Sequence, residues 1–261
     1  MDYKAILTES AGYAKEALWG RWARWLIFII CSLPMALVPF VMDPKKIFTG
    51  TAVHWETVPW GELAVIVVVG ILLSFFVAGY IVRVYRGVSP APEFDDWGTL
   101  FIDGIRLTVV GILWFIPLMA VLALMLATAF LGMAGGRGAS AGLWIGLVLV
   151  LVVIEIALAV VTVLYSILGS VRFSRTGSIL EGIRFTAITG TIRTIGWGRY
   201  VIALVILMVV AIAFFAVMSV FSLVPYAGWV VQLVLTPLYS IFSARYISRV
   251  YDHGVPQAAA P

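Results

Sequence analysis

Residues 63–82 read LAVIVVVGILLSFFVAGYIV, a run without a charged side chain that ends immediately before Arg83. A helix rises 1.5 Å per residue, so a run of this length crosses the roughly 30 Å hydrocarbon core of a bilayer. The rest of the chain has the same character, because hydrophobic residues make up 63% of its 261 positions and charged residues only 11%. A soluble domain carries roughly 25% charged residues. The sequence therefore predicts an integral membrane protein.

Five further stretches are comparably long and apolar. We therefore expect an all-α polytopic membrane protein, forming a single integral membrane domain over residues 1–261. Its six transmembrane helices are expected at residues 22–42, 63–84, 107–131, 143–168, 200–223 and 229–247. Pro34, Pro39, Pro117 and Pro237 fall inside these spans. A membrane protein tolerates them because neighbouring helices can bind the freed backbone groups.

The basic residues predict the orientation of the chain. Of its 17 Lys and Arg residues, only Lys45, Lys46 and Arg137 fall in the connections on one side. The other fourteen lie near the two termini or in the connections between spans 2 and 3 and between spans 4 and 5. The positive-inside rule places that second side in the cytoplasm, so we expect a cell-membrane protein with both termini cytoplasmic. The net charge of +4 then faces the anionic inner leaflet and does not indicate nucleic acid.

Three cytoplasmic segments, residues 3–18, 93–105 and 178–195, mix apolar and charged positions at helical spacing. They are predicted to be interfacial amphipathic helices. Short motifs also recur, because Asp-Gly-Ile-Arg at 103–106 reappears as Glu-Gly-Ile-Arg at 181–184, and Tyr-Ile-x-Arg-Val-Tyr occurs at both 80–85 and 246–251. These copies indicate a three-fold parallel hairpin repeat, with units at 1–92, 93–172 and 173–261.

The stretch around the second cytoplasmic segment carries a family resemblance. It reads Gly79-Tyr80, then Arg83, then Pro92-Glu93-Phe94-Asp95-Asp96-Trp97, then Phe101-x-Asp103-Gly104. This pattern resembles the hallmark of a family of uncharacterised polytopic membrane proteins of archaea and bacteria, catalogued as a domain of unknown function. The similarity is specific over residues 79–117, although Ala91-Pro92 stands where that family has Leu-Pro. The resemblance implies a six-span prokaryotic membrane protein and supplies no activity.

The same stretch gathers carboxylates at the expected cytoplasmic surface. The candidate site residues are Glu93, Asp95, Asp96, Trp97 and Asp103. Carboxylates can bind a divalent cation or act as an acid/base pair, but neighbours in a helix point about 100° apart. We therefore favour a helix cap, anchored by the tryptophan, over a metal site. Candidate basic residues at the inner interface, for pairing with these acids or for holding lipid headgroups or a phosphate, are Arg83, Arg86, Arg172 and Arg249.

Glu155 lies halfway along the fourth expected span. An ionisable group at the bilayer centre costs at least a few kcal/mol, so it is expected to face a polar partner. The candidates follow one stripe of the sixth span: Gln232, Thr236 and Ser240. Such a site could act as structural hydrogen bonding between helices, or it could bind protons or a substrate.

No catalytic motif is recognisable. The chain has no Gly-x-Ser-x-Gly, phosphate-binding loop, His-Glu-x-x-His or Cys-x-x-Cys, and its one cysteine, Cys31, excludes an intrachain disulfide. His54 and His253 are expected on opposite sides of the membrane, so they cannot share a metal or haem. We therefore expect a protein that is not an enzyme and that needs no cofactor or metal.

Three functional classes remain, and an intramembrane enzyme ranks last because no nucleophile and base are recognisable. Two functions fit the sequence better. The first is a non-catalytic scaffold or accessory subunit whose cytoplasmic interfacial helices bind membrane lipids or a partner, either another membrane protein or a second copy of the chain. The second is a small transporter with a midplane site around Glu155. One acid and a few hydroxyls suit a packed bundle better than an aqueous pathway, so the sequence favours the scaffold.

Overall fold

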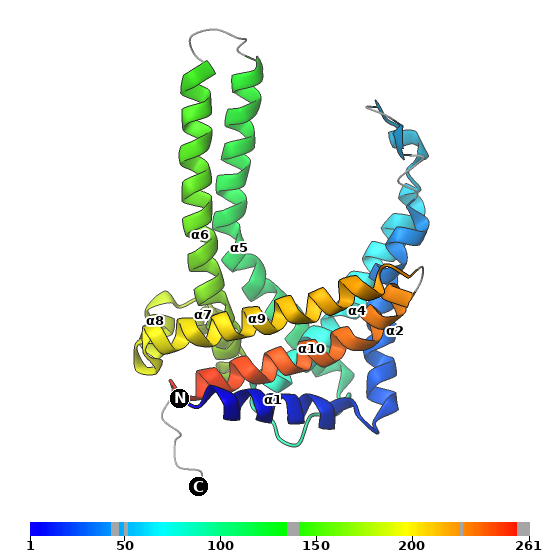
Figure 1. Ribbon diagram of the computed structural model, residues 1–261, viewed down its shortest axis with the longest axis vertical. Helices are drawn as coiled ribbons and strands as arrows, with labels where there is room; N and C mark the ends of the chain where they lie inside the picture. The colour runs from blue at the N-terminus through cyan, green and yellow to red at the C-terminus, as the bar shows by residue number, and fades with distance from the viewer. Residues whose placement is uncertain (43–46, 50–51, 135–140, 225–226, 255–261) are drawn as a thin grey trace. The chain divides into compact units, whose positions relative to one another are not determined.

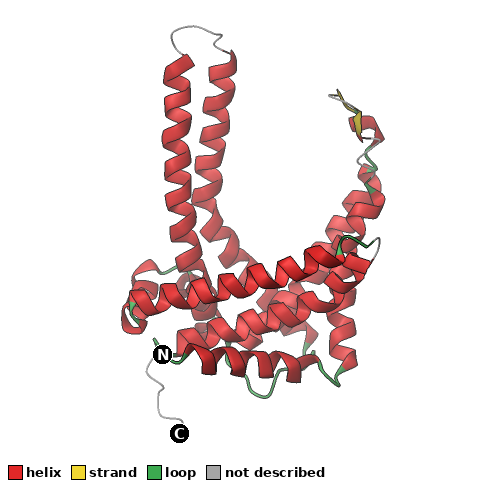
Figure 2. Cartoon of the chain, in the orientation of Figure 1, coloured by secondary structure: helices red, strands yellow, loops and turns green. Residues whose placement is uncertain are grey.

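The computed structural model describes residues 1–42, 47–49, 52–134, 141–224 and 227–254. Within them, six helices are long and apolar enough to cross a membrane, which confirms the predicted all-α, six-span fold class (Figures 1 and 2). These helices are α2 (Trp22–Val41), α4 (Trp60–Tyr85), α5 (Trp97–Ala134), α6 (Ala141–Thr176), α9 (Trp197–Phe221) and α10 (Ala227–Asp252). Their number was readable from the sequence because each is a long run of apolar residues.

The remaining elements lie between or before these helices. They are α1 (Tyr3–Leu18), β1 (Phe48–Thr49), β2 (Ala52–Val53), η1 (Trp55–Thr57), α7 (Ile179–Gly182) and α8 (Phe185–Ile195). The two short strands pair antiparallel and were not predicted. In the same connection, the indole of Trp60 donates a hydrogen bond to the Trp55 carbonyl at 3.3 Å, and both side chains are exposed.

Two of the three predicted interfacial segments differ from expectation. Residues 93–105 do not form a separate helix, because α5 begins at Trp97 and continues unbroken into the third span. Only the single glycines Gly98, Gly104 and Gly111 interrupt its helix-forming residues before Pro117, and a single glycine does not end a helix. Residues 178–195 form two helices, α7 and α8. The break follows Gly182, whose carbonyl accepts a hydrogen bond from the Trp114 indole at 3.1 Å.

The chain divides into two compact units. Unit 1 comprises Met1–Arg106 and Thr191–Pro261, and unit 2 comprises Leu107–Gly190. Unit 1 thus holds α1, α2, α4, α9 and α10. Unit 2 holds most of α5 and all of α6 and α7, and the second boundary between the units falls within α8. The single integral domain and the three repeat units inferred from the sequence stay predictions.

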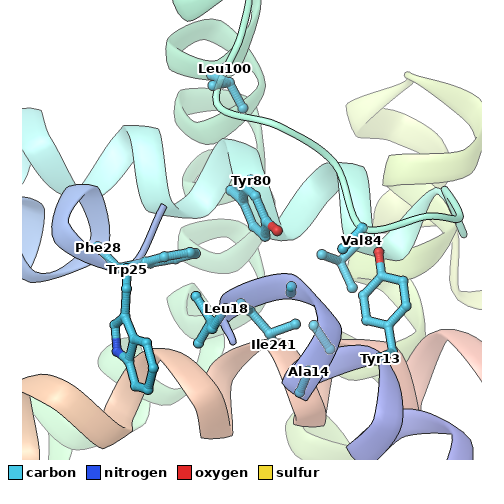
Figure 3. Packing of buried hydrophobic residues seen from close by; sticks show 12 residues of the cluster. Tyr13, Ala14, Leu18, Trp25, Phe28, Tyr80, Val84, Leu100 and Ile241 are labelled. Carbon is cyan, nitrogen blue, oxygen red and sulfur yellow. The ribbon is translucent and has the colours of Figure 1, made fainter. Parts of the chain in front are cut away.

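The core of unit 1 lies where α1, α2, α4 and α10 meet. Tyr80 and Phe28 are almost wholly buried there, with ring centroids 5.0 Å apart in an edge-to-face arrangement (Figure 3). Leu18 of α1 and Ile241 of α10 pack into the same cluster. Burying one large apolar side chain contributes roughly 1.5–3 kcal/mol, so this cluster fixes α1 against the membrane-spanning helices.

Helices α4 and α5 approach each other at two glycines. A Cβ atom on Gly79 would lie 1.9 Å from the carbonyl oxygen of Leu100, and one on Gly104 would lie 1.8 Å from that of Phe75. Each helix therefore uses a glycine to admit the backbone of the other, as helices packed in membranes commonly do. This crossing holds the start of α5, and the acidic residues before it, against the end of α4.

Candidate functional site

Residues 93–97, hereafter the acidic segment, bind arginines of unit 1 through the carboxylates of Glu93 and Asp95. Glu93 accepts hydrogen bonds from Arg24 Nε at 2.6 Å and from Arg21 Nη1 at 2.7 Å, and a second contact from Arg24 completes a bidentate pair. The Arg24 side chain is 4% exposed, whereas that of Glu93 is 58% exposed. A buried guanidinium needs a counter-charge, so Glu93 has a structural task that the sequence did not reveal.

The other acids of this stretch also have protein partners. Asp95 pairs with Arg83, whose guanidinium further donates to the Asp95 carbonyl at 2.9 Å. The buried Asp103 pairs with Arg86 at 2.7 Å. These two pairs match the partners expected from the sequence, whereas Arg172, also considered as a partner of the acidic segment, binds Glu181.

Asp96 occupies the position immediately before α5. Its side chain accepts hydrogen bonds from the backbone N–H and the hydroxyl of Thr99, the geometry of an N-cap. Its φ of 44° lies in the left-handed region, which aspartate tolerates better than most residues. The helix cap favoured from the sequence is therefore present at Asp96, and Trp97 is the first residue of α5.

Aromatic contacts also fix the acidic segment against α2 and α4. Phe94 stacks on Tyr80 with centroids 4.7 Å apart and on Trp97 at 5.9 Å, while Phe28 meets Phe94 edge-on at 5.0 Å. Stacked and edge-on pairs of this kind contribute about 0.5–1.5 kcal/mol beyond burial. The residues of the hallmark pattern thus contact one another and form a structural clamp between α2, α4 and α5.

A second set of ion pairs joins α1 to α10. Glu9 accepts hydrogen bonds from Arg245 Nη2 at 2.8 Å and from Arg249 Nε at 3.0 Å. Arg245, which is 3% exposed, also lies 4.3 Å above the Tyr13 ring. Arg249 was among the candidate site residues predicted from the sequence, whereas Glu9 and Arg245 were not. The available signal was that Arg245 and Arg249 are four residues apart and so share one face of a helix.

Unit 2 contains an analogous pair. Glu181 accepts hydrogen bonds from Arg172 Nε at 2.9 Å and from Arg184 Nη1 at 2.9 Å. The glycine after it, Gly182, packs so closely that a Cβ would lie 2.8 Å from the Phe173 Cβ. Asp103-Gly104 and Glu181-Gly182 therefore make the same kinds of local contact. In each, the acid binds an arginine near the end of the preceding long helix, and the glycine packs against that helix. The three-fold repeat stays a prediction.

The arginines tune the acids that they bind. The hydrogen bond from Arg24 lowers the pKa of Glu93, and those from Arg172 and Arg184 lower the pKa of Glu181. Partial burial raises the pKa of Glu9, but the hydrogen bonds from Arg249 and Arg245 outweigh this effect and the net pKa is lowered. All three carboxylates are therefore held in their charged form, which suits ion pairing and not proton donation.

The intramembrane candidates fall into two places. Gln232 and Thr236 line a cavity of about 320 Å³ between α2 and α10, together with Ser32. Ser240 donates a hydrogen bond to the Thr236 carbonyl at 2.9 Å, so its hydroxyl already has a partner within α10. Glu155 lies in α6 of unit 2, and its Oε2 atom is buried with no hydrogen-bond partner among the described residues. The predicted pairing of Glu155 with the stripe on α10 stays a prediction.

The part of the chain that the structure describes holds no group of three or more His, Cys, Asp or Glu side chains placed to share a metal ion. Asp95 and Asp96, the neighbouring acids considered for such a site, turn to Arg83 and Thr99 respectively. Asp95 therefore forms an ion pair and Asp96 caps α5.

Comparison with known proteins gives one match. The model of a family described as Protein of unknown function (DUF4013) matches residues 63–223. This range contains the acidic segment and both Gly-Ile-Arg copies. No curated protein and no solved structure matches the chain.

Proposed function

Since this chain belongs to the DUF4013 family, whose description names no activity, we propose its function from its own geometry. It is a non-catalytic scaffold or accessory subunit of the cell membrane, with both termini in the cytoplasm. Its inner-side helices hold membrane lipid or a partner protein. The observation that carries this proposal is the pairing of Glu93 with the buried Arg24. Because of this pair, the glutamate of the acidic segment stabilises the fold and is not free to act in catalysis.

Helix α1 supplies the binding face in this proposal. One side of α1 is buried through Ile6, Ala14 and Ala17, and the opposite side exposes Lys4 and Glu16. A helix buried on one side and charged on the other suits the membrane–water boundary. Basic side chains there attract anionic headgroups, by about 1 kcal/mol each.

The ties between α1 and the rest of unit 1 make it a fixed platform. The Tyr13 hydroxyl donates to the Val88 carbonyl at 2.9 Å, and the Tyr3 hydroxyl donates to the Arg199 carbonyl at 3.1 Å. The Glu9 pairs with Arg245 and Arg249 lie between these two anchors in the sequence of α1. A surface held at several points loses little conformational entropy when it binds, which favours a docking role.

A small transporter is the alternative function. The cavity lined by Ser32, Gln232 and Thr236 supports it, because polar side chains inside membrane-spanning helices commonly mark substrate or ion sites. The unpartnered Oε2 of Glu155 supports it in the same way. We rank it second because no acid or base lines that cavity in the described residues, and coupling to protons or cations needs an ionisable group.

Extraction from native membranes into polymer-bounded discs tests the proposal. Wild-type protein should retain a lipid or protein in fixed ratio, and Lys4→Glu should lose most of it because it reverses a basic charge on the exposed α1 face. Glu56→Lys, an equally drastic change at an exposed acid before α4, is the matched control and should retain it. A wild-type chain that retains nothing, yet shows solute flux in reconstituted vesicles that Glu155→Gln abolishes, would replace the scaffold with the transporter.

A further inference from the structure

Unit 1 contains an apolar cavity between α1 and two of its long helices, α9 and α10. It has a volume of about 440 Å³, within the roughly 300–1,000 Å³ typical of small-molecule sites. One wall is α1, through Ala11 and Ala14, and the opposite walls are α9, through Val210 and Phe214, and α10. Its lining is almost entirely carbon, and two of its walls belong to membrane-spanning helices.

The walls are held in place without a ligand. The Trp25 indole, which lines the cavity, donates a hydrogen bond to the Val234 carbonyl at 2.7 Å. Phe214 and Tyr239 stack on each other with ring centroids 4.8 Å apart. Leu18, which also belongs to the α1 wall, is 1% exposed. A cavity with fixed apolar walls is a preformed site, because its side chains lose little conformational entropy when a ligand binds.

Among the described residues that line this cavity, one carries a positive charge. Lys15 of α1 is exposed and forms no ion pair within the described residues. The arginines nearest to it in the sequence, Arg21 and Arg24, are both occupied by Glu93. The neighbouring Glu16 points about 100° away around the helix, so it does not neutralise the Lys15 ammonium. Trp19, one turn further on, is 68% exposed, as expected of a tryptophan at a membrane–water boundary.

From this arrangement we infer that the cavity binds one acyl chain of an anionic phospholipid, whose phosphate lies on Lys15. The hydrocarbon chain matches the carbon-lined interior, and the phosphate supplies the charge that the unpaired ammonium lacks. A peptide segment fits less well, because its backbone N–H and C=O groups would find almost no polar partner on these walls. The inference rests on the proposed function and names the lipid that the scaffold holds.

The test uses the full-length protein in detergent, with native mass spectrometry after addition of phosphatidylglycerol or phosphatidylcholine of the same chain length. Wild type should retain phosphatidylglycerol preferentially. Ala11→Trp and Val210→Trp, which fill the cavity from opposite walls, should each lower that retention about tenfold or more. Lys15→Gln should remove most of the preference for phosphatidylglycerol, about fivefold for one lost phosphate contact. Ala5→Trp, the same change at an exposed α1 position away from the cavity, should bind as wild type does.

Equal retention of both lipids by wild type would overturn the inference, as would phosphatidylglycerol binding that survives both tryptophan variants in folded protein. Oleate that displaces phosphatidylglycerol at equal concentration would assign the cavity to free fatty acids and overturn the phospholipid assignment. A protein partner retained by Ala11→Trp, with phosphatidylglycerol lost, supports both proposals, since the partner depends on the outer face of α1. Failure of the lipid test alone therefore leaves the scaffold function standing.

Discussion

Trp25 of α2 and Trp229 of α10 bind each other's helices in the same way. The Trp25 indole donates to the Val234 carbonyl of α10, and the Trp229 indole donates to the Ala36 carbonyl of α2, both at 2.7 Å. Each acceptor comes directly after the carbonyl, that of Leu233 or Met35, which lacks its helical N–H partner because Pro237 or Pro39 lies four residues later. The indoles therefore bind the backbone beside a break in the helical hydrogen bonding, as expected of neighbouring helices around proline within membrane spans.

Replacing either indole by a phenyl ring tests this relationship. Trp25→Phe and Trp229→Phe keep an aromatic ring but remove the donor, so each should lower the free energy of unfolding by about 1 kcal/mol. Trp19→Phe is the control, because that side chain is exposed and its indole makes no hydrogen bond within the described residues. Thermal unfolding in detergent measures all three. An equal loss in the control would show that tryptophan size, and not the indole N–H, stabilises the fold.

The crossing of α4 and α5 predicts a strong effect of single methyl groups. Gly79→Ala and Gly104→Ala should each destabilise the protein by more than about 3 kcal/mol, because the new Cβ would overlap a backbone carbonyl that cannot move away. Gly98→Ala, in the same helix as Gly104, places its Cβ in open space and should be neutral or slightly stabilising. The yield and melting temperature of monodisperse protein measure the difference. Wild-type stability in Gly104→Ala would contradict the close approach.

The Arg24–Glu93 pair predicts a dependence on pH. Because the pKa of Glu93 is lowered in the folded protein, the pair stabilises the fold at neutral pH. That stability starts to fall near the ordinary carboxyl pKa of about 4.5 and is lost as pH passes below the lowered value. Glu93→Gln should reduce stability at pH 7 by about 2 kcal/mol, since it leaves the buried Arg24 without its counter-charge.

Melting temperatures between pH 7 and pH 3.5 measure this effect, and Glu93→Gln should lose less of its stability over that range than wild type does. Glu16→Gln is the matched control, because Glu16 is exposed and forms no ion pair within the described residues. Parallel pH profiles for wild type and Glu93→Gln would rule out the pair as a source of stability.

How much the sequence could predict depends on how local each interaction is. Runs of apolar residues predicted all six long helices, and the residues before Trp97 predicted a cap by an aspartate, which the structure places at Asp96. By contrast, Glu93 is 69 residues from Arg24 and Glu9 is 236 from Arg245, so no local pattern could pair them. The merging of residues 97–105 into α5 was missed because an amphipathic stretch can also begin a long helix. The cavity under α1 has no sequence signal, because apolar residues line lipid-facing surfaces and cavities alike.

The orientation of the chain is a prediction that labelling can decide. In a Cys31→Ser background, Glu56→Cys should react with a membrane-impermeant maleimide on intact cells, because Glu56 belongs to the predicted outer connection. Leu180→Cys should react only after permeabilisation, because α7 belongs to a predicted cytoplasmic connection. Both side chains are exposed, at 72% and 74%, so accessibility within the fold does not limit either reaction. Labelling of Leu180→Cys from outside would invert the topology and with it the placement of the acidic segment.

Glu155 separates the scaffold from the transporter. Its Oε2 atom is enclosed without a hydrogen-bond partner in the described residues, and an uncompensated polar group in hydrocarbon costs several kcal/mol. The partner expected from the sequence is Gln232, Thr236 or Ser240, and the test takes Gln232 as the example. If the two side chains pair, Glu155→Leu and Gln232→Leu should each cost about 0.6 kcal/mol, and the double variant should lose less than the sum of the two. Additive losses would refute the pairing.

The amide variant then decides the role of the carboxyl. If Glu155 is structural, Glu155→Gln should keep most of the hydrogen bonding, so its stability and its retained lipid or partner should match wild type. If Glu155 carries protons or cations, Glu155→Gln should fold normally yet abolish flux in reconstituted vesicles, because an amide does not ionise. Thr162→Val in the same helix, which removes a buried hydroxyl without touching the carboxyl, is the control. Flux that both variants abolish equally would indicate a packing defect in α6 and would argue against a charge-carrying role for Glu155.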